Sequence, residues 1–242
     1  KKWLFRIKPG KYLFIPACLG LDAFPEMNPY TCALILREPY YFSYYTATSH
    51  YGWTEQLSDV FYVATLHQQN CWGRRRGNAV EGVVGQTHRT EHAAFYVTVK
   101  PVRIAQHKLF GYIKQSVFST EVNMASKEKA VVDAVDKPHL TGGISNVAKT
   151  LVRAKRQVDW ELVIDYAIKM QSKSLCARLG YLLSKLSIVE GLNISALAPY
   201  LPSCYVHLGN PQRWGRRGKT NKDWHIIENV PHSYLLSEVT IR

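Results

Sequence analysis

Residues 122–153, VNMASKEKAVVDAVDKPHLTGGISNVAKTLVR, contain the pattern that decides the fold. Ser126 is placed to cap a helix, because its hydroxyl can accept a hydrogen bond from a free backbone N–H. Glu128 then lies in the first turn, near the positive end of the helix dipole. Apolar residues follow in one stripe: Ala130, Val131, Ala134 and Val135. Pro138 ends this helix, since proline cannot continue a helix interior.

A second helix follows a glycine turn in the same stretch. Gly142 and Gly143 supply the turn, because glycine adopts backbone angles that other residues avoid. Apolar residues then recur at helical spacing: Ile144, Val147, Ala148, Leu151 and Val152. The stretch therefore predicts a packed pair of consecutive helices.

The flanking segments predict an α+β (mixed α/β) fold. Runs rich in β-branched and aromatic residues predict strands at 60–65 and 94–99, two within 110–125, and two more at 205–208 and 224–230. Ser43 is placed to cap a helix that stops at Gly52, and Asp159 to cap a helix with an apolar stripe. A leucine-rich helix follows from Ser174. We expect a small β-sheet packed with helices, followed by a mostly helical C-terminal part.

Residues 1–20, KKWLFRIKPGKYLFIPACLG, predict a β-hairpin with a basic tip at 8–11. Their net charge is +5, and the first acidic residue is Asp22. A basic hairpin at this position is typical of the wing of a winged helix whose helices lie upstream, so the fold would include an incomplete winged helix. An ordinary edge hairpin with solubilising lysines is the alternative.

The charge of the chain indicates the class of partner. Its 242 residues include 31 Lys and Arg against 18 Asp and Glu, a net charge of +13. Such an excess indicates a polyanionic partner. Hydrophobic residues at 46% argue against a disordered chain. No apolar run approaches the roughly 20 residues that span a bilayer, and the five cysteines form no C-x-x-C pair. We expect a cytoplasmic protein with no membrane association, metal or disulfide framework.

Three basic clusters predict contacts with double-stranded DNA. They lie at the hairpin tip, at 74–76 and within 210–223, where Trp214 adds a ring for stacking. A solvated charged loop is the alternative for each cluster taken singly. The predicted nucleic-acid-binding residues are Arg6, Lys8, Lys11, Arg74, Arg75, Arg76, Arg213, Arg216, Arg217 and Lys219.

Catalytic patterns are weak. Residues 88–92, HRTEH, fit the inverted zinc-protease pattern but lie between a Gly-rich loop and a strand, without helical context. No Asp or Glu has Lys two residues later, as a restriction-type nuclease strand would have, and the phosphate-binding glycine motifs are absent. We predict no catalytic residue and no cofactor. The alternative function is a nuclease-like enzyme with an atypical site, which replacement of Glu91 or Glu128 would test.

The order of several motifs resembles the AbiEi-type antitoxins and predicted transcriptional regulators of prokaryotes. Residues 122–133 carry most of this resemblance. The other matching residues are Gly10-Lys11-Tyr12, Pro16, 40–43, 50–52, 60–65, Gly142-Gly143, Asp159-Trp160 and 178–183.

The resemblance implies a domain organisation and a function. Residues 1–28 would be the wing of a truncated winged-helix domain with its linker, and residues 29–242 the regulatory and antitoxin domain. Members of the family repress their own operon and neutralise a toxin that resembles a nucleotidyltransferase. The resemblance thus implies an autorepressor that is also the antitoxin of a type IV-like pair. A protein-binding antitoxin without a role on DNA is the remaining alternative.

Overall fold

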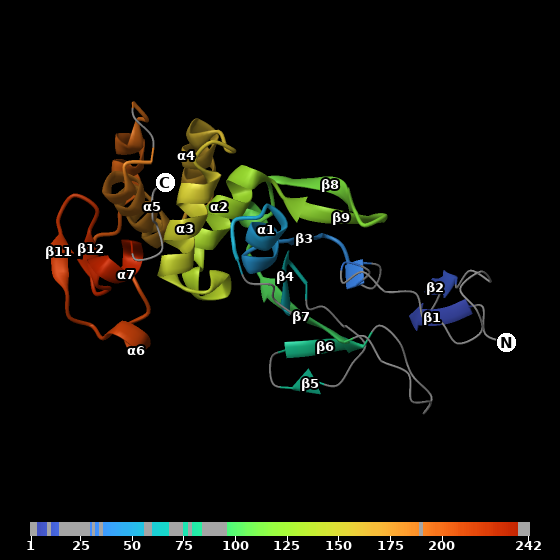
Figure 1. Cartoon of the computed structure of the whole chain (residues 1–242). Helices are drawn as coiled ribbons and strands as arrows, with labels where there is room; N and C mark the ends of the chain where they lie inside the picture. Colours follow the sequence, from blue (N-terminus) through green and yellow to red (C-terminus); the bar gives the residue numbers. More distant parts are fainter. Residues whose placement is uncertain are drawn as a thin grey trace. The chain divides into compact units, whose positions relative to one another are not determined.

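The computed structural model confirms an α+β fold (Figure 1). The chain divides into two compact units. The first comprises Lys1–Phe42, Ser58–Ile104 and Lys114–Met124, and the second comprises Ser43–Leu57, Ala105–Ile113 and Ala125–Arg242. The structure describes residues 4–8, 11–14, 30, 32–33, 36–55, 60–67, 75–76, 79–83, 96–188 and 191–236. The expected boundary at residue 28 lies outside the described residues.

The first unit is built on a seven-stranded mixed sheet in the order β5-β6-β7-β4-β3-β9-β8. Its central strands β4 and β7 run parallel, while β3 is antiparallel to β4 and parallel to β9. The bounds are β3 Tyr40–Phe42, β4 Val60–Thr65, β5 Arg75–Arg76, β6 Ala79–Val83, β7 Tyr96–Arg103, β8 Tyr112–Val117 and β9 Thr120–Ala125. The strands predicted at 60–65, at 94–99 and within 110–125 are therefore confirmed, with β7 extending further than expected.

A separate two-stranded sheet confirms the N-terminal hairpin. Strand β1 (Leu4–Lys8) pairs antiparallel with β2 (Lys11–Phe14), and Leu4 is opposite Phe14. The strands meet where the sequence places the basic tip. Whether this hairpin is a wing stays a prediction.

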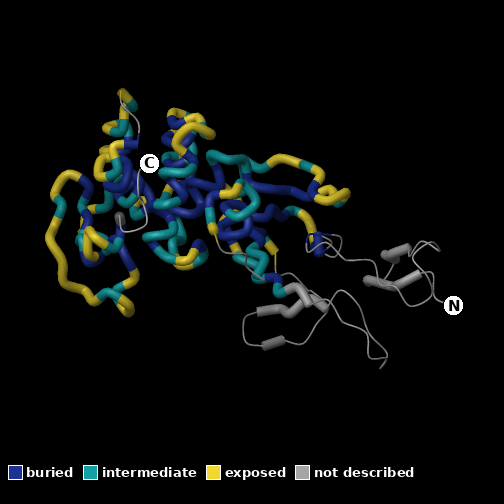
Figure 2. The backbone as a smooth tube through the Cα atoms, viewed as in Figure 1, coloured by how far each residue is buried: buried dark blue, intermediate teal, exposed yellow. Residues whose placement is uncertain are grey.

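Helix α2 (Lys127–Asp136) is the centre of the second unit. It packs against α1 (Tyr45–His50), α3 (Ile144–Ala154), α4 (Trp160–Lys169) and α5 (Lys173–Leu186) (Figure 1). Every residue from 129 to 135 is buried (Figure 2). A helix enclosed on all sides needs side chains that fit on every face, which explains its Ala- and Val-rich composition. The sequence predicts the buried stripe, but the structure buries the remaining face too.

Local capping chemistry confirms two of three predicted helix starts. The Ser126 hydroxyl accepts from the Lys129 N–H at 3.2 Å, and Asp159 accepts from two N–H groups of α4. The predicted cap at Ser43 is wrong. The N-cap of α1 is Tyr44, whose φ of 55° is left-handed, and the Ser43 hydroxyl instead donates to Asp133 at 2.6 Å. A buried carboxylate far along the chain has displaced the local hydrogen bond.

The C-terminal part holds a small three-stranded sheet in the order β10-β12-β11. It comprises β10 Val206–His207, β11 Lys219–Asn221 and β12 Ile226–Glu228, with η5 Ile194–Tyr200, α6 Pro211–Trp214 and α7 His232–Leu236 around it. The sequence predicts β10 and β12 but misses α6 and β11. In the described part of the chain, no helix has the length and apolar character required to cross a bilayer.

Trp224 fixes this small sheet to α5. Its ring lies so close to Gly180 that a Cβ at that position would overlap it. Its indole N–H donates to the Ser184 hydroxyl at 3.0 Å. Only glycine at 180 allows the ring to approach the helix backbone this closely.

Candidate nucleic-acid interface

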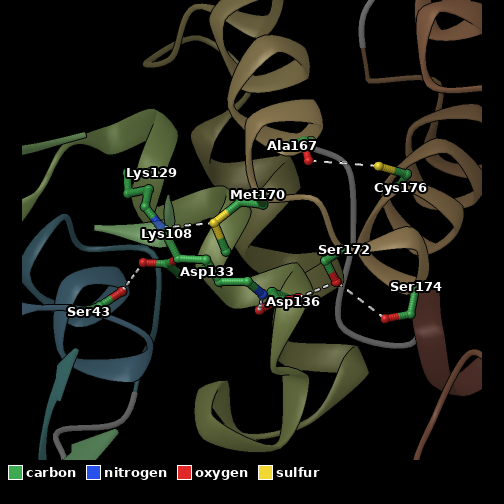
Figure 3. Close-up of polar contacts among 10 residues, drawn as sticks. All are labelled: Ser43, Lys108, Lys129, Asp133, Asp136, Ala167, Met170, Ser172, Ser174 and Cys176. Atoms are coloured by element: carbon green, nitrogen blue, oxygen red, sulfur yellow. Dashed lines mark hydrogen bonds and ion pairs between the residues drawn. The ribbon is translucent and has the colours of Figure 1, made fainter. Parts of the chain in front are cut away.

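A buried polar network organises the helices of the second unit (Figure 3). The ammonium of Lys129 pairs with Asp133 one turn later, and the two side chains are 0% and 1% exposed. Lys129 also lies 3.3 Å from the sulfur of Met170 and 4.9 Å from the centre of the Phe110 ring. The Ser43 hydroxyl also donates to the Asp133 carboxylate. Because substrate cannot reach groups this buried in the folded state, we assign the network to positioning helices.

A second carboxylate extends the network toward α5. Asp136 accepts from the Lys108 ammonium at 3.1 Å and from the Ser172 hydroxyl at 2.7 Å (Figure 3). The Cys176 thiol donates weakly to the Ala167 carbonyl at 3.8 Å, and burial raises its pKa to about 11. Such a thiol is protonated and unreactive at neutral pH. These buried groups thus join the helices to one another. The polar groups that a partner could contact lie on the surface.

The strongest surface feature is the segment 210–222, which we call the basic arm. It carries five cations and no acidic residue, namely Arg213, Arg216, Arg217, Lys219 and Lys222. All five are exposed (Figure 2). A dense run of exposed cations produces a positive potential that attracts a phosphodiester backbone.

Aromatic packing anchors the start of the arm. The rings of Trp214 and Tyr234 are 4.5 Å apart, and the Arg213 guanidinium lies 5.2 Å from the Trp214 ring. Arg213 also donates to the Tyr234 hydroxyl at 3.0 Å. The Asn210 side chain caps α6 by accepting from the Gln212 N–H at 2.9 Å. These contacts fix the orientation of the first residues of the arm.

Side-chain hydrogen bonds to backbone carbonyls hold the middle of the arm. Asn229 donates to the Gly215 carbonyl at 2.9 Å, and a ring nitrogen of His207 lies 3.1 Å from the Arg216 carbonyl. Gly215 has a φ of +78°, which turns the chain between α6 and β11. These contacts fix the backbone and leave the side chains of Arg216 and Arg217 in solvent, which is the arrangement needed to contact phosphates.

Of the three predicted clusters, the structure describes the side chains of only one, the cluster in the basic arm. Arg213, Arg216, Arg217 and Lys219 form the arm of the second unit. The remaining predicted residues belong to the first unit: Arg6 and Lys8 on β1, Lys11 on β2, and Arg75 and Arg76 on β5. Arg74 lies outside the described residues.

Some residues that shape the interface give no signal in the sequence. Tyr234, Asn229 and His207 are neither Lys nor Arg, yet they orient the arm. Residues 88–92 lie outside the described residues, so the zinc-protease pattern is not tested. Glu128 accepts from the Asp159 N–H at 3.4 Å and so helps to join α2 to α4. Across the described ranges, no three His, Cys, Asp or Glu side chains cluster as metal ligands would.

Comparison with solved structures identifies a similar fold. The crystal structure of the Rv2827c protein from Mycobacterium tuberculosis superposes with a TM-score of 0.60 at 14% sequence identity, over 98% of this chain and 78% of that one. At this identity the likeness concerns the fold alone. No protein-family model matches this chain. No curated protein matches it either.

Proposed function

We propose that this protein is a cytoplasmic DNA-binding transcriptional regulator that represses its own operon, and that it is the antitoxin of a type IV-like pair. The observation that carries the DNA-binding part is the basic arm, with five exposed cations and no acid. The net charge of +13 supports the same partner.

The arm suits a phosphate backbone better than a base edge. Arg216 and Arg217 lie on a turn whose carbonyl groups contact the side chains of Asn229 and His207. The helix of the arm, α6, has four residues and is too short to lie along a major groove. Phosphate contacts fix the position and orientation of a protein on DNA without reading sequence. We infer that the arm supplies affinity, and that sequence is read by another part of the molecule.

Salt dependence tests the DNA-binding part. Binding of the full chain to a duplex from its own upstream region is measured by fluorescence anisotropy at several salt concentrations. The logarithm of the binding constant should fall steeply with the logarithm of salt, by about 0.9 for each phosphate contact. Replacing Arg216 and Arg217 with Gln should lower the slope by about 2.

A matched variant separates the arm from net charge. Lys155 and Arg156 are also adjacent exposed cations, but they follow the C-terminal end of α3. The 11 residues of α3 place them about 16 Å along the helix from its N-terminal end. Their double replacement with Gln should leave the slope nearly unchanged. Equal losses in both double variants, or binding that does not depend on salt, would overturn the assignment of the arm.

The antitoxin part rests on the family resemblance. It predicts that expression of this chain relieves the growth defect caused by the product of the adjacent gene. Co-purification with that product would favour the remaining alternative, a protein-binding antitoxin without a role on DNA. If neither occurs while DNA binding holds, the protein is a solitary regulator.

A further inference from the structure

A cavity of about 870 Å³ lies in the second unit beside the start of the basic arm. One wall is the turn between η4 (Pro138–Thr141) and α3, including Gly143 and Ser145. The other is formed by β10 and α6, including His207 and Trp214. We call this cavity the α3 groove. Its volume lies in the range of small-molecule sites, roughly 300–1,000 Å³.

The lining of the α3 groove is cationic. Arg178 and Arg213 line it together with His139 and His207, and none of the lining residues that the structure describes is Asp or Glu. Arg178 is half-buried, and its Nε donates to the His207 carbonyl at 3.3 Å. Burial lowers the pKa of His139, and the neighbouring charges of Lys137 and Arg178 lower it further. The positive charges of Lys137 and Arg178 beside His139 would also favour an anion in the groove.

The backbone adds donors at the same place. Helix α3 has 11 residues, and no side chain caps its N-terminus. The first-turn N–H groups of α3 therefore have no capping side chain, and Gly143, Ile144 and Ser145 at this end of the helix line the groove. Gly143 has a φ of +100°, and the space where its side chain would stand is open. Free N–H groups at a helix N-terminus form a natural cradle for phosphate.

A second cavity, of about 370 Å³, reaches the same helix end from the other side. It shares Gly142, Ser145, Arg213 and Tyr234 with the α3 groove. Trp53, which is 1% exposed, also lines it, and its indole N–H has no acceptor among the residues that the structure describes. A buried donor without an acceptor costs about 1–3 kcal/mol, so this N–H is available to a bound acceptor.

We propose that the α3 groove binds a mononucleotide, with its phosphate at the N-terminus of α3 and its base against Trp214 or Tyr205. The charge and the N–H groups select the phosphate. The aromatic side chains select the base, because every base offers a face for stacking. Tyr205 is 42% exposed and so remains open to such contact. This site is a second function beside DNA binding and uses the groove rather than the tip of the arm.

Calorimetric titration of the full chain with adenosine 5′-monophosphate, inorganic phosphate and adenosine tests the proposal. The monophosphate should bind most tightly, phosphate more weakly, and adenosine without measurable heat. Ser145→Asp places a carboxylate in the first turn of α3, where it favours the helix but repels a phosphate. This variant should fold normally and lose about tenfold or more in affinity for both anions.

Two further variants complete the test. Trp214→Leu should weaken binding of the monophosphate and leave inorganic phosphate unchanged. Lys185→Gln changes the net charge as much as Ser145→Asp but lies outside both cavities, so its affinities should match the wild type. Absence of saturable binding at millimolar monophosphate, or equal affinity in wild type and Ser145→Asp, would overturn the proposal. The DNA assay of the basic arm is independent of either result.

Discussion

Replacing Asp133 with Ala should destabilise the protein strongly. The carboxylate is 1% exposed and is the ion-pair partner of Lys129, which is 0% exposed. Without it, the ammonium still lies against the sulfur of Met170 and the ring of Phe110, and neither of these groups carries a negative charge. Removing one partner of a buried pair costs about 3–5 kcal/mol, because the other charge stays buried without compensation. The Ser43 hydroxyl also loses its acceptor.

The free energy of unfolding is measured by urea denaturation followed by circular dichroism. For a chain of this size, the expected loss corresponds to a fall in melting temperature on the order of 10 °C. Asp165→Ala is the matched control. Asp165 is exposed on α4, and its loss should change stability by less than about 0.5 kcal/mol.

A multiple variant separates the charge effect from packing. Replacing Lys129 with Met, Asp133 with Leu and Ser43 with Ala removes both charges of the ion pair and the Ser43 hydroxyl together, so neither charge of the pair is left alone. Buried ion pairs can often be replaced by apolar residues with little loss. This variant should therefore be more stable than Asp133→Ala. If Asp133→Ala costs less than about 1 kcal/mol, or if the triple variant is the less stable of the two, the reasoning about desolvation is wrong.

Two further predictions concern packing and pH. Gly180→Ala should cost about 1–3 kcal/mol in urea denaturation, because the added Cβ would overlap the Trp224 ring, and an unchanged midpoint would contradict the close approach. His139 has a pKa below its ordinary value of 6.5 in the folded state, so the unfolded chain takes up a proton first and stability should fall as the pH drops below about 6.5. His139→Gln should reduce this loss of stability between neutral pH and pH 5. Part of the loss should remain, because burial also lowers the pKa of His50. Identical pH profiles of the urea midpoint would refute a role for His139.

The sequence alone determined the elements whose signals lie within a few residues. Ser126 and Asp159 cap helices because their acceptors are two or three residues from the donors they satisfy. The strand at 60–65 and the hairpin of β1 and β2 follow from alternation and composition. Helix α2 begins and ends close to the positions set by Ser126 and Pro138. In each case the free energy that favours the element is local.

Only the tertiary structure decided the roles of groups whose partners are distant in the chain. Ser43 abandons a local cap because Asp133, 90 residues away, offers a buried charged acceptor. Lys129 is a charged residue in an ordinary helix sequence, and it is buried because four other helices pack around α2. The α3 groove likewise combines His139, Arg178 and His207 with the arm. Helix capping and apolar periodicity depend on residues within about one turn of the chain. The free energy of a buried charge depends on all the groups that surround it in space, and these are fixed only when the helices pack.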